Sequence, residues 1–228
     1  MSSFIKHQTA LALFNTGLRR FLSVAALSAP MLATAAPVNL LTNGSFEDVG
    51  MAAGTQLQAN GTWQIYSQLP GWSGGANGIE VRNNVEGRAQ DGFNFVELDT
   101  TQNSIALQSL NTIAGAIYNL SFYFAPRPST SNRAANTNNI DVFWNGTLLS
   151  TVGGTNATRN HTWQRYDFSV AGTGGMDALR FQASGTSDSY GGSLDNVSLT
   201  AVPEPGSIAL VLGGLLAAGA ATRRRRNS

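Results

Sequence analysis

The sequence contains no cysteine, which excludes a disulfide framework, a Cys-ligated zinc site, an iron–sulfur cluster and a thiol nucleophile. Charged residues make up only 12% of the 228 residues, which is about half of the usual share in a globular protein. Straight-chain residues that favour helices are scarce, whereas Gly occurs 25 times. This composition favours a turn-rich β protein over a helical one.

The formal net charge of +1 conceals an uneven distribution of charge along the chain. Between Val38 and Ala201 there are seven Arg, no Lys and twelve Asp or Glu, so this stretch is acidic. The other basic residues lie near the two ends. Because a protein needs a basic face to neutralise nucleic-acid phosphates, we expect no nucleic-acid partner.

Residues 1–36 have the pattern of a secretory signal peptide that signal peptidase removes. Three basic residues are followed by an apolar run over residues 21–32 and then by the small residues Ala33 and Ala35. The alternative is an N-terminal membrane anchor. The apolar run is shorter than the roughly 20 residues of a membrane span, which favours cleavage.

Residues 202–228 have three parts. A stiff polar hinge opens the segment, and an uncharged, mostly apolar stretch over residues 206–222 follows it. This stretch is long enough to cross a thin bilayer as a transmembrane helix. A terminal Arg cluster would hold the cytoplasmic side by the positive-inside rule. The residues of the hinge and of the cluster are Val202, Pro203, Glu204 and Pro205, and Arg223, Arg224, Arg225 and Arg226.

The order of hinge, apolar span and Arg cluster resembles the PEP-CTERM sorting signal of Gram-negative bacteria. The resemblance implies an exported protein that passes through an inner-membrane intermediate, where an exosortase recognises and removes the tail. It further implies release or attachment at the cell surface or in the extracellular matrix. The simpler alternative is a plain C-terminal membrane tail.

Residues 37–201 read as one β domain. Apolar and polar residues alternate over residues 118–124, 140–144, 166–170 and 179–183, and Val197 and Leu199 close the series. The dipeptide Asn145-Gly146 predicts a two-residue hairpin turn, because both residues tolerate a positive φ. Many short strands at regular intervals predict an all-β fold, namely an antiparallel β-sandwich or jelly roll.

The two ends of this domain resemble the first and last strands of galactose-binding-like jelly rolls, in residues 39–47 and 192–199. Short motifs between them are similar to the choice-of-anchor family of secreted bacterial surface proteins; these motifs occupy residues 69–72, 78–81, 91–92 and 95–99. The resemblance implies an eight-to-ten-stranded sandwich related to carbohydrate-binding modules.

The same resemblance implies a structural calcium ion that ties the first strand to the last. The matching carboxylates are Glu47 and Asp195, and both stand in Gly-, Asn- and Ser-rich surroundings that offer carbonyl oxygens. The alternative is that Glu47 takes part in a turn and Asp195 caps a strand end, without an ion.

A saccharide-binding surface needs aromatic faces for stacking and planar polar groups for paired hydrogen bonds. Trp144 alternates with apolar residues and is predicted to be core, while Trp163 is either core or edge. Trp72 follows Pro70-Gly71 and is predicted to lie in a loop. The predicted ligand-binding residues are Trp72, Glu80, Arg82, Glu97, Asp99, Arg127 and Asn138.

Motifs for catalysis are absent from the sequence: there is no Gly-x-Ser-x-Gly elbow, His-Glu-x-x-His helix or phosphate-binding loop. His161 is the only His outside the predicted signal peptide, and a lone His in a loop is usually solvated. Two of the three carboxylates Glu80, Glu97 and Asp99 could form an acid–base pair for glycoside chemistry. We nevertheless expect no enzyme, but a protein that binds extracellular polysaccharide; a purely structural or adhesive protein is the alternative.

Overall fold

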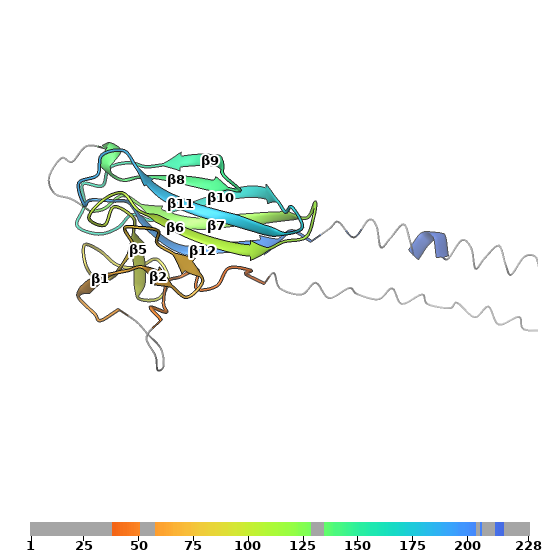
Figure 1. The fold of residues 1–228 in the computed structure, drawn as a ribbon, viewed down its shortest axis with the longest axis horizontal. Coiled ribbons are helices and arrows are strands. Elements are labelled where there is room, and N and C mark those ends of the chain that lie inside the picture. The colour runs from red at the N-terminus through yellow and green to blue at the C-terminus, as the bar shows by residue number, and fades with distance from the viewer. Residues whose placement is uncertain (1–37, 51–57, 129–134, 204–205, 207–212, 217–228) are drawn as a thin grey trace, which may run out of the picture. The chain divides into compact units, whose positions relative to one another are not determined.

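The computed structural model describes residues 38–50, 58–128, 135–203, 206 and 213–216. Between residues 38 and 203 the described part of the chain forms two antiparallel β-sheets and one short 3₁₀ helix, η1 (Ala135–Thr137) (Figure 1). The predicted all-β antiparallel sandwich is confirmed. The predicted signal peptide, residues 1–36, lies outside the described residues.

Each sheet has six strands. The first sheet has the order β1 (Thr62–Tyr66), β4 (Ile79–Asn83), β5 (Asn94–Glu97), β12 (Ser193–Ala201), β7 (Ile117–Ala125) and β10 (Gln164–Ala171). The second sheet has the order β2 (Gln68–Leu69), β3 (Trp72–Ser73), β6 (Ile105–Asn111), β11 (Met176–Ser184), β8 (Asn139–Trp144) and β9 (Thr147–Val152).

The core lies between the sheets and is built by the alternation seen in the sequence. In β7 the apolar side chains at even positions are buried, from Tyr118 to Phe124. In β8 the same holds for Ile140, Val142 and Trp144, so the prediction that Trp144 is core is confirmed. Because successive side chains point to opposite faces of a strand, each strand also presents a polar row away from the core.

The predicted hairpin at Asn145-Gly146 joins β8 to β9. Both turn residues have positive φ, 49° and 79°, as a two-residue hairpin of this type requires.

A β-bulge in β12 determines which side chains of the last strand point into the core and which point outward. The register with β7 shifts between Asp195 and Ser198, and Asn196 takes a positive φ of 48°. The bulge brings Val197 into the core after Leu194 and leaves Asp195 on the outer face of the first sheet. Ser193 lies on the same outer face, directly opposite Glu97 of β5.

None of the helices within the described residues is long and apolar enough to cross a membrane. Residues 213–216 are helical. Most of the predicted transmembrane helix, 206–222, falls outside the described residues, as do Glu204, Pro205 and the Arg cluster at 223–226.

Candidate functional site

A buried cluster of charged side chains covers the outer face of β4 and β5. Ile79, Val81 and Val96 of these strands point into the core, so the alternate residues of the same strands point outward. Four residues that were predicted as ligand-binding groups meet here, and we call them the charged cluster: Glu80, Arg82, Glu97 and Arg127.

Glu97 is the centre of the charged cluster. Its Oε2 lies 3.2 Å from Nε of Arg82, and its Oε1 lies 3.2 Å from Nη1 of Arg127. Arg82 also contacts Glu80, with Nη2 and Oε1 2.5 Å apart. Glu97 is only 1% exposed, and burial raises the pKa of its carboxyl to about 7, although Arg82 and Arg127 act in the opposite direction.

The charged cluster is not fully satisfied by hydrogen bonds. Among the described residues, Nη1 of Arg82 and Nε of Arg127 are buried without a hydrogen-bond partner. Buried polar groups in native structures are almost always paired, so unpaired donors mark this region as a place where another molecule or water completes the network.

Arg127 reaches Glu97 because three other residues hold its loop. Its guanidinium stacks 4.2 Å above the centre of the Tyr190 ring and donates from Nη1 to the carbonyl of Ser189 at 2.8 Å. Oδ1 of Asn138 accepts the backbone N–H of Arg127 at 2.9 Å. The predicted residue Asn138 therefore positions Arg127.

Asp99 fastens the neighbouring loop in a similar way. Its carboxylate accepts the backbone N–H groups of Asp188 and Ser189 at 2.8 and 2.9 Å and the hydroxyl of Ser187 at 2.9 Å. Asp99 is fully buried. The predicted residue thus holds the loop that carries Tyr190, and its own oxygens face that loop.

A pocket of about 390 Å³ lies over the same sheet and is lined by Arg88, Ala89, Asn160, His161 and Trp163. His161 and Trp163 are half-buried, while Arg88 and Asn160 are exposed. The two rings lie 4.8 Å apart, and both pack edge-on against Phe95 of β5. The pocket therefore combines an aromatic wall with planar polar groups.

The carbonyl of Arg88 fixes both rings of the pocket. Nε1 of Trp163 donates to it at 3.0 Å, and Nδ1 of His161 lies 3.1 Å from it. Since a carbonyl only accepts, Nδ1 of His161 carries the hydrogen, and Nε2 accepts from the hydroxyl of Ser193 at 2.9 Å. Burial lowers the pKa of His161 to about 4, which keeps the ring neutral.

Gly87 allows the loop before Arg88 to lie against His161. A Cβ at this position would stand 2.3 Å from Nδ1 of His161, and the φ of Gly87 is 143°. Only Gly adopts this backbone conformation readily.

The hydrogen bond between Ser193 and His161 is the only feature that this pair shares with the nucleophile and base of a catalytic dyad. Ser193 is fully buried beneath the imidazole, so a substrate has no approach to its hydroxyl in this conformation. His161 itself was expected to be solvated and is instead part of the pocket wall.

Trp72 lies away from this surface. The prediction that it lies in a loop and contacts a ligand is therefore wrong. Its ring is 2% exposed and packs against Phe46 and Phe181 in the core. Pro70-Gly71 does form a turn, but the turn joins β2 to β3 and directs the indole inward, where Nε1 donates to the carbonyl of Asn43. No face of Trp72 is available to a ligand.

Trp63 is an exposed aromatic residue that was not among the predicted ligand-binding residues. It lies on β1 directly opposite Arg82, so it shares the outer face of the first sheet, and it is 54% exposed.

The carboxylates of Glu47 and Asp195 converge on one loop. Oε1 of Glu47 accepts the N–H groups of Phe93 and Asn94, and Oδ2 of Asp195 accepts those of Gln90 and Asp91. Asp195 is fully buried, and burial raises the pKa of its carboxyl to about 8, although these N–H groups oppose the shift.

This loop has the chemistry of a calcium site in part. Asp195 takes part in no ion pair among the described residues. Both carboxylates offer oxygen ligands, which Ca²⁺ prefers. No group of three or more metal-binding side chains occurs in the part of the chain that the structure describes. Besides Glu47 and Asp195, a calcium ion would need several backbone carbonyls as ligands.

Residues 201–226 match the PEP-CTERM protein-sorting motif. The match confirms the motif recognised in the sequence and indicates an exported protein that an exosortase processes at the membrane. No curated protein matches the chain.

Several solved structures share the fold. A cyclase from Fischerella sp. in its apo form is 17% identical, with a TM-score of 0.52, over 74% of this chain and 98% of that chain. The Stig cyclase Fisc from Fischerella sp. TAU is 16% identical, with a TM-score of 0.53, over 75% and 100%.

Carbohydrate-binding modules are also among the similar structures. TmCBM61 in complex with β-1,4-galactotriose is 16% identical, with a TM-score of 0.46, over 72% of this chain and 99% of that chain. A CBM35 from Paenibacillus barcinonensis is 21% identical, with a TM-score of 0.40, over 62% and 100%.

The similarity to the cyclases bears on the prediction about enzyme activity. The absence of catalytic motifs led to the prediction that this chain is not an enzyme, and that prediction is contradicted because enzymes share its sandwich. At this identity the likeness concerns the fold and assigns no reaction to the chain.

Proposed function

We propose that the protein is an exported, exosortase-sorted surface or matrix protein whose sandwich binds extracellular polysaccharide. The observation that carries the proposal is the pocket lined by Trp163, His161, Arg88 and Asn160 on the outer face of the first sheet. The PEP-CTERM motif supports the cellular setting, because it places the protein among exported proteins.

The pocket suits a sugar ring for two physical reasons. The half-buried indole of Trp163 is held by the Arg88 carbonyl, so its stacking face is pre-oriented. The guanidinium of Arg88 and the amide of Asn160 are planar groups that form paired hydrogen bonds with vicinal hydroxyls. The exposed indole of Trp63 offers a second stacking face on the same sheet.

The charged cluster gives this surface a rigid base. Arg82 from β4 and Arg127 from a loop hold Glu97, and their buried, unpaired N–H groups are donors for bridging water. Arg127, whose side chain is 11% exposed, remains a ligand-binding residue in this proposal. Glu80, Arg82 and Glu97 are buried and support the surface, with Asp99 and Asn138 as further positioning residues.

In the proposed life cycle, signal peptidase removes residues 1–36 and an exosortase removes the tail that follows the domain. The tail spans the inner membrane of a Gram-negative bacterium before removal, and the galactose-binding-like jelly roll then remains at the cell surface or in the matrix. An affinity gel that contains the host's matrix polysaccharide tests the binding function. Retarded migration of the purified protein supports it, whereas unretarded migration on every matrix polysaccharide favours a structural or adhesive role.

We also propose that Glu47 and Asp195 hold a structural calcium ion. The support is their convergence on residues 90–94 and the burial of Asp195 without a cationic side chain beside it among the described residues. The ion would favour the ionised form of Asp195 and tie the N-terminal segment to the last strand.

A further inference from the structure

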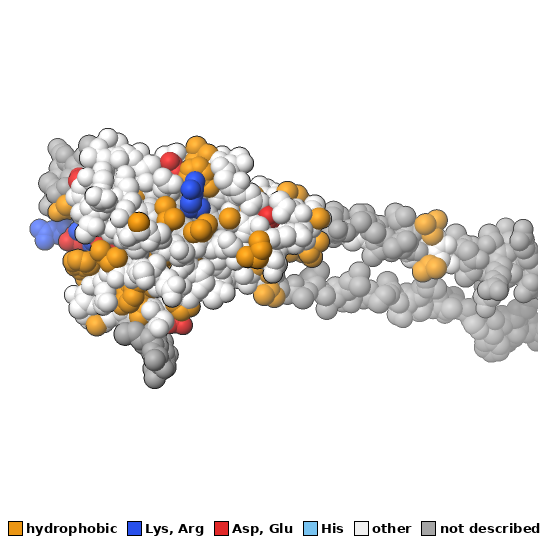
Figure 2. All heavy atoms as spheres, in the orientation of Figure 1, with side chains coloured by type: hydrophobic (Ala, Val, Ile, Leu, Met, Phe, Trp, Pro, Cys, Tyr) orange, Lys and Arg blue, Asp and Glu red, His pale blue; other side chains and the backbone are white. Residues whose placement is uncertain are grey.

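One end of the sandwich presents exposed aliphatic side chains, and we call it the apolar end. Its residues are 40–72% exposed: Val38, Leu40, Ile113, Ile117, Met176 and Val202. Figure 2 shows hydrophobic side chains gathered at this end of the domain. Soluble proteins seldom expose contiguous apolar surface of this kind without a partner.

Backbone contacts bring these residues together from distant parts of the sequence. Val202 donates its N–H to the carbonyl of Ile117 at 2.9 Å. The turn that carries Ile113 is bonded to the turn that precedes Met176, from the N–H of Thr112 to the carbonyl of Gly175 at 3.1 Å. Leu40 donates to the carbonyl of Leu199 at 2.8 Å.

The two turns are held outward. Buried Asp177 accepts the hydroxyl of Thr112 at 2.6 Å, the N–H of Thr173 at 2.9 Å and the side-chain amide of Asn145 at 2.8 Å. These charge-assisted bonds fix the turns, so Ile113 and Met176 cannot fold back onto the core.

The turns also lack charge. Residues 112–116 and 171–176 contain no Asp, Glu, Lys or Arg. A bilayer accepts such turns at its headgroup boundary, because no charged group has to be desolvated.

The position of the sorting motif in the chain indicates that the partner of the apolar end is the lipid bilayer. The PEP-CTERM match begins at residue 201, and Val202 is itself part of the apolar end. Only three residues lie between Val202 and Gly206, where the predicted membrane span starts, and the four steps from Val202 to Gly206 reach at most about 14 Å. While the tail is in the membrane, the apolar end is therefore held close to the lipid surface.

We propose that the apolar end docks on the lipid bilayer in the membrane-bound intermediate, with Ile113 and Met176 inserted at the headgroup boundary. The inference rests on the membrane-bound intermediate described under the proposed function and is independent of saccharide binding. Docking would seat the domain on the membrane and hold the hinge at residues 202–205 at the lipid surface, where an exosortase acts.

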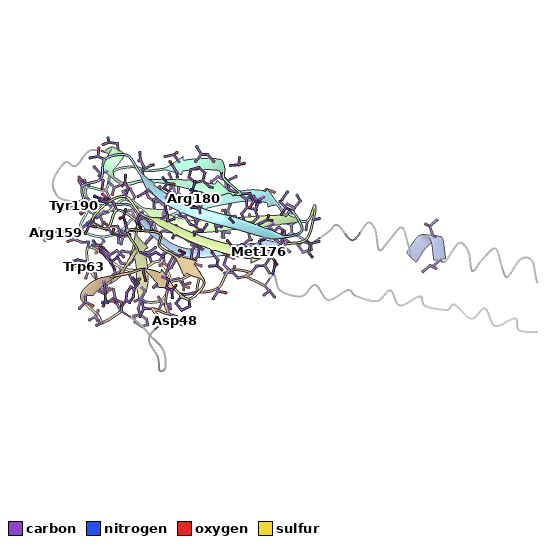
Figure 3. The ribbon with its side chains drawn as sticks, viewed as in Figure 1. Asp48, Trp63, Arg159, Met176, Arg180 and Tyr190 are labelled. Atoms are coloured by element: carbon purple, nitrogen blue, oxygen red, sulfur yellow. The ribbon has the colours of Figure 1, made fainter. Side chains whose placement is uncertain are left out.

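The absence of cysteine allows a direct test with a single label. Met176→Cys in the full chain is labelled with the environment-sensitive dye NBD and reconstituted into phosphatidylcholine vesicles. Arg159→Cys is the matched control, because Arg159 is also exposed and Figure 3 places it far from Met176. We expect a blue-shifted emission at position 176 that lipid-borne doxyl groups quench at least twofold more strongly than at position 159.

Equal, water-like emission at both positions would overturn the proposal. A blue shift at position 176 that disappears at about one chain per vesicle would assign the apolar end to a second copy of the chain, and would also overturn it. Failure of the labelled chain to float with the vesicles would refute the membrane-bound intermediate itself. Because flotation and dye emission are separate readings, the two failures are distinguishable. A second label, Ile113→Cys, repeats the test if Met176→Cys does not fold.

Discussion

The carboxylate of Glu97 and the guanidinium of Arg82 lie 3.2 Å apart on neighbouring strands, and both side chains are almost completely buried. A pair of this kind on the outer face of a sheet is unusual, because that face ordinarily meets water. Here loops cover it, and the pair forms the base of the surface on which the pocket stands.

Arg82→Met keeps most of the length of the side chain and removes its charge. Glu80 and Glu97 would then be buried with less compensation, so we expect a loss of about 3 kcal/mol in the free energy of unfolding. Urea unfolding of the wild type and the variant measures this difference.

The matched control is Arg165→Met. Arg165 also pairs with a carboxylate, with its Nη2 2.8 Å from Oδ1 of Asp167, but both side chains are about half exposed. An exposed pair contributes little, so we expect a loss of about 0.5 kcal/mol or less. Equal losses in the two variants would show that the burial of the Arg82 ion pairs has no energetic consequence.

His161 predicts a specific dependence of stability on pH. Its pKa in the folded protein is lowered to about 4 from an ordinary value of 6.5. The neutral ring therefore stabilises the fold above about pH 6.5, and this contribution is lost as the pH falls through about 4, with a total of about 3 kcal/mol. His161→Gln removes the titration, so the difference in stability between wild type and variant should shrink by this amount between pH 7 and pH 4.

Comparison with the variant is needed because Glu97 acts in the opposite direction over the same range. Its pKa is raised to about 7, so its contribution is present below its ordinary value near 4.5 and is lost as the pH rises through about 7. A difference between wild type and His161→Gln that stays constant with pH would contradict a buried, neutral imidazole.

Calcium should raise the melting temperature of the wild type. A ligand that binds only the folded state adds about 2.7 kcal/mol of stability at a hundredfold excess over its Kd. Excess chelator should reverse the gain, as followed by calorimetry. Asp195→Asn should abolish the calcium response, whereas Asp141→Asn should retain it, since Asp141 bonds to Thr151 and Ser184 on the other sheet. A melting temperature that is indifferent to calcium in the wild type refutes the ion.

The strands that alternate strictly were predictable from the sequence, because one buried face imposes a period of two. β7, β8, β10 and β11 are examples, and Asn145-Gly146 identified its hairpin through φ alone. Glu80, Arg82, Glu97 and Arg127 were predicted to belong to one binding surface. The sequence did not predict that they would be buried, because their burial depends on loops that cover the outer face.

The errors at Trp72 and His161 have a common origin. Pro70-Gly71 indicates a turn but not the direction in which the next side chain points, and here the two short strands direct Trp72 into the core. His161 depends on partners that are far away in sequence, Arg88 and Ser193. The alternation of His161 and Trp163 was the only local sign that both rings face the same way.

The central claim is that the pocket at Trp163 binds polysaccharide, and affinity electrophoresis of Trp163→Ala against Phe143→Ala tests it most directly. Phe143 is a half-buried aromatic residue on β8 of the second sheet, where Arg180 stacks on it. Loss of one stacking contact of about 1.5 kcal/mol corresponds to roughly a tenfold weaker affinity. We predict this loss for Trp163→Ala and wild-type retardation for Phe143→Ala; equal retardation of both variants and the wild type would contradict the claim.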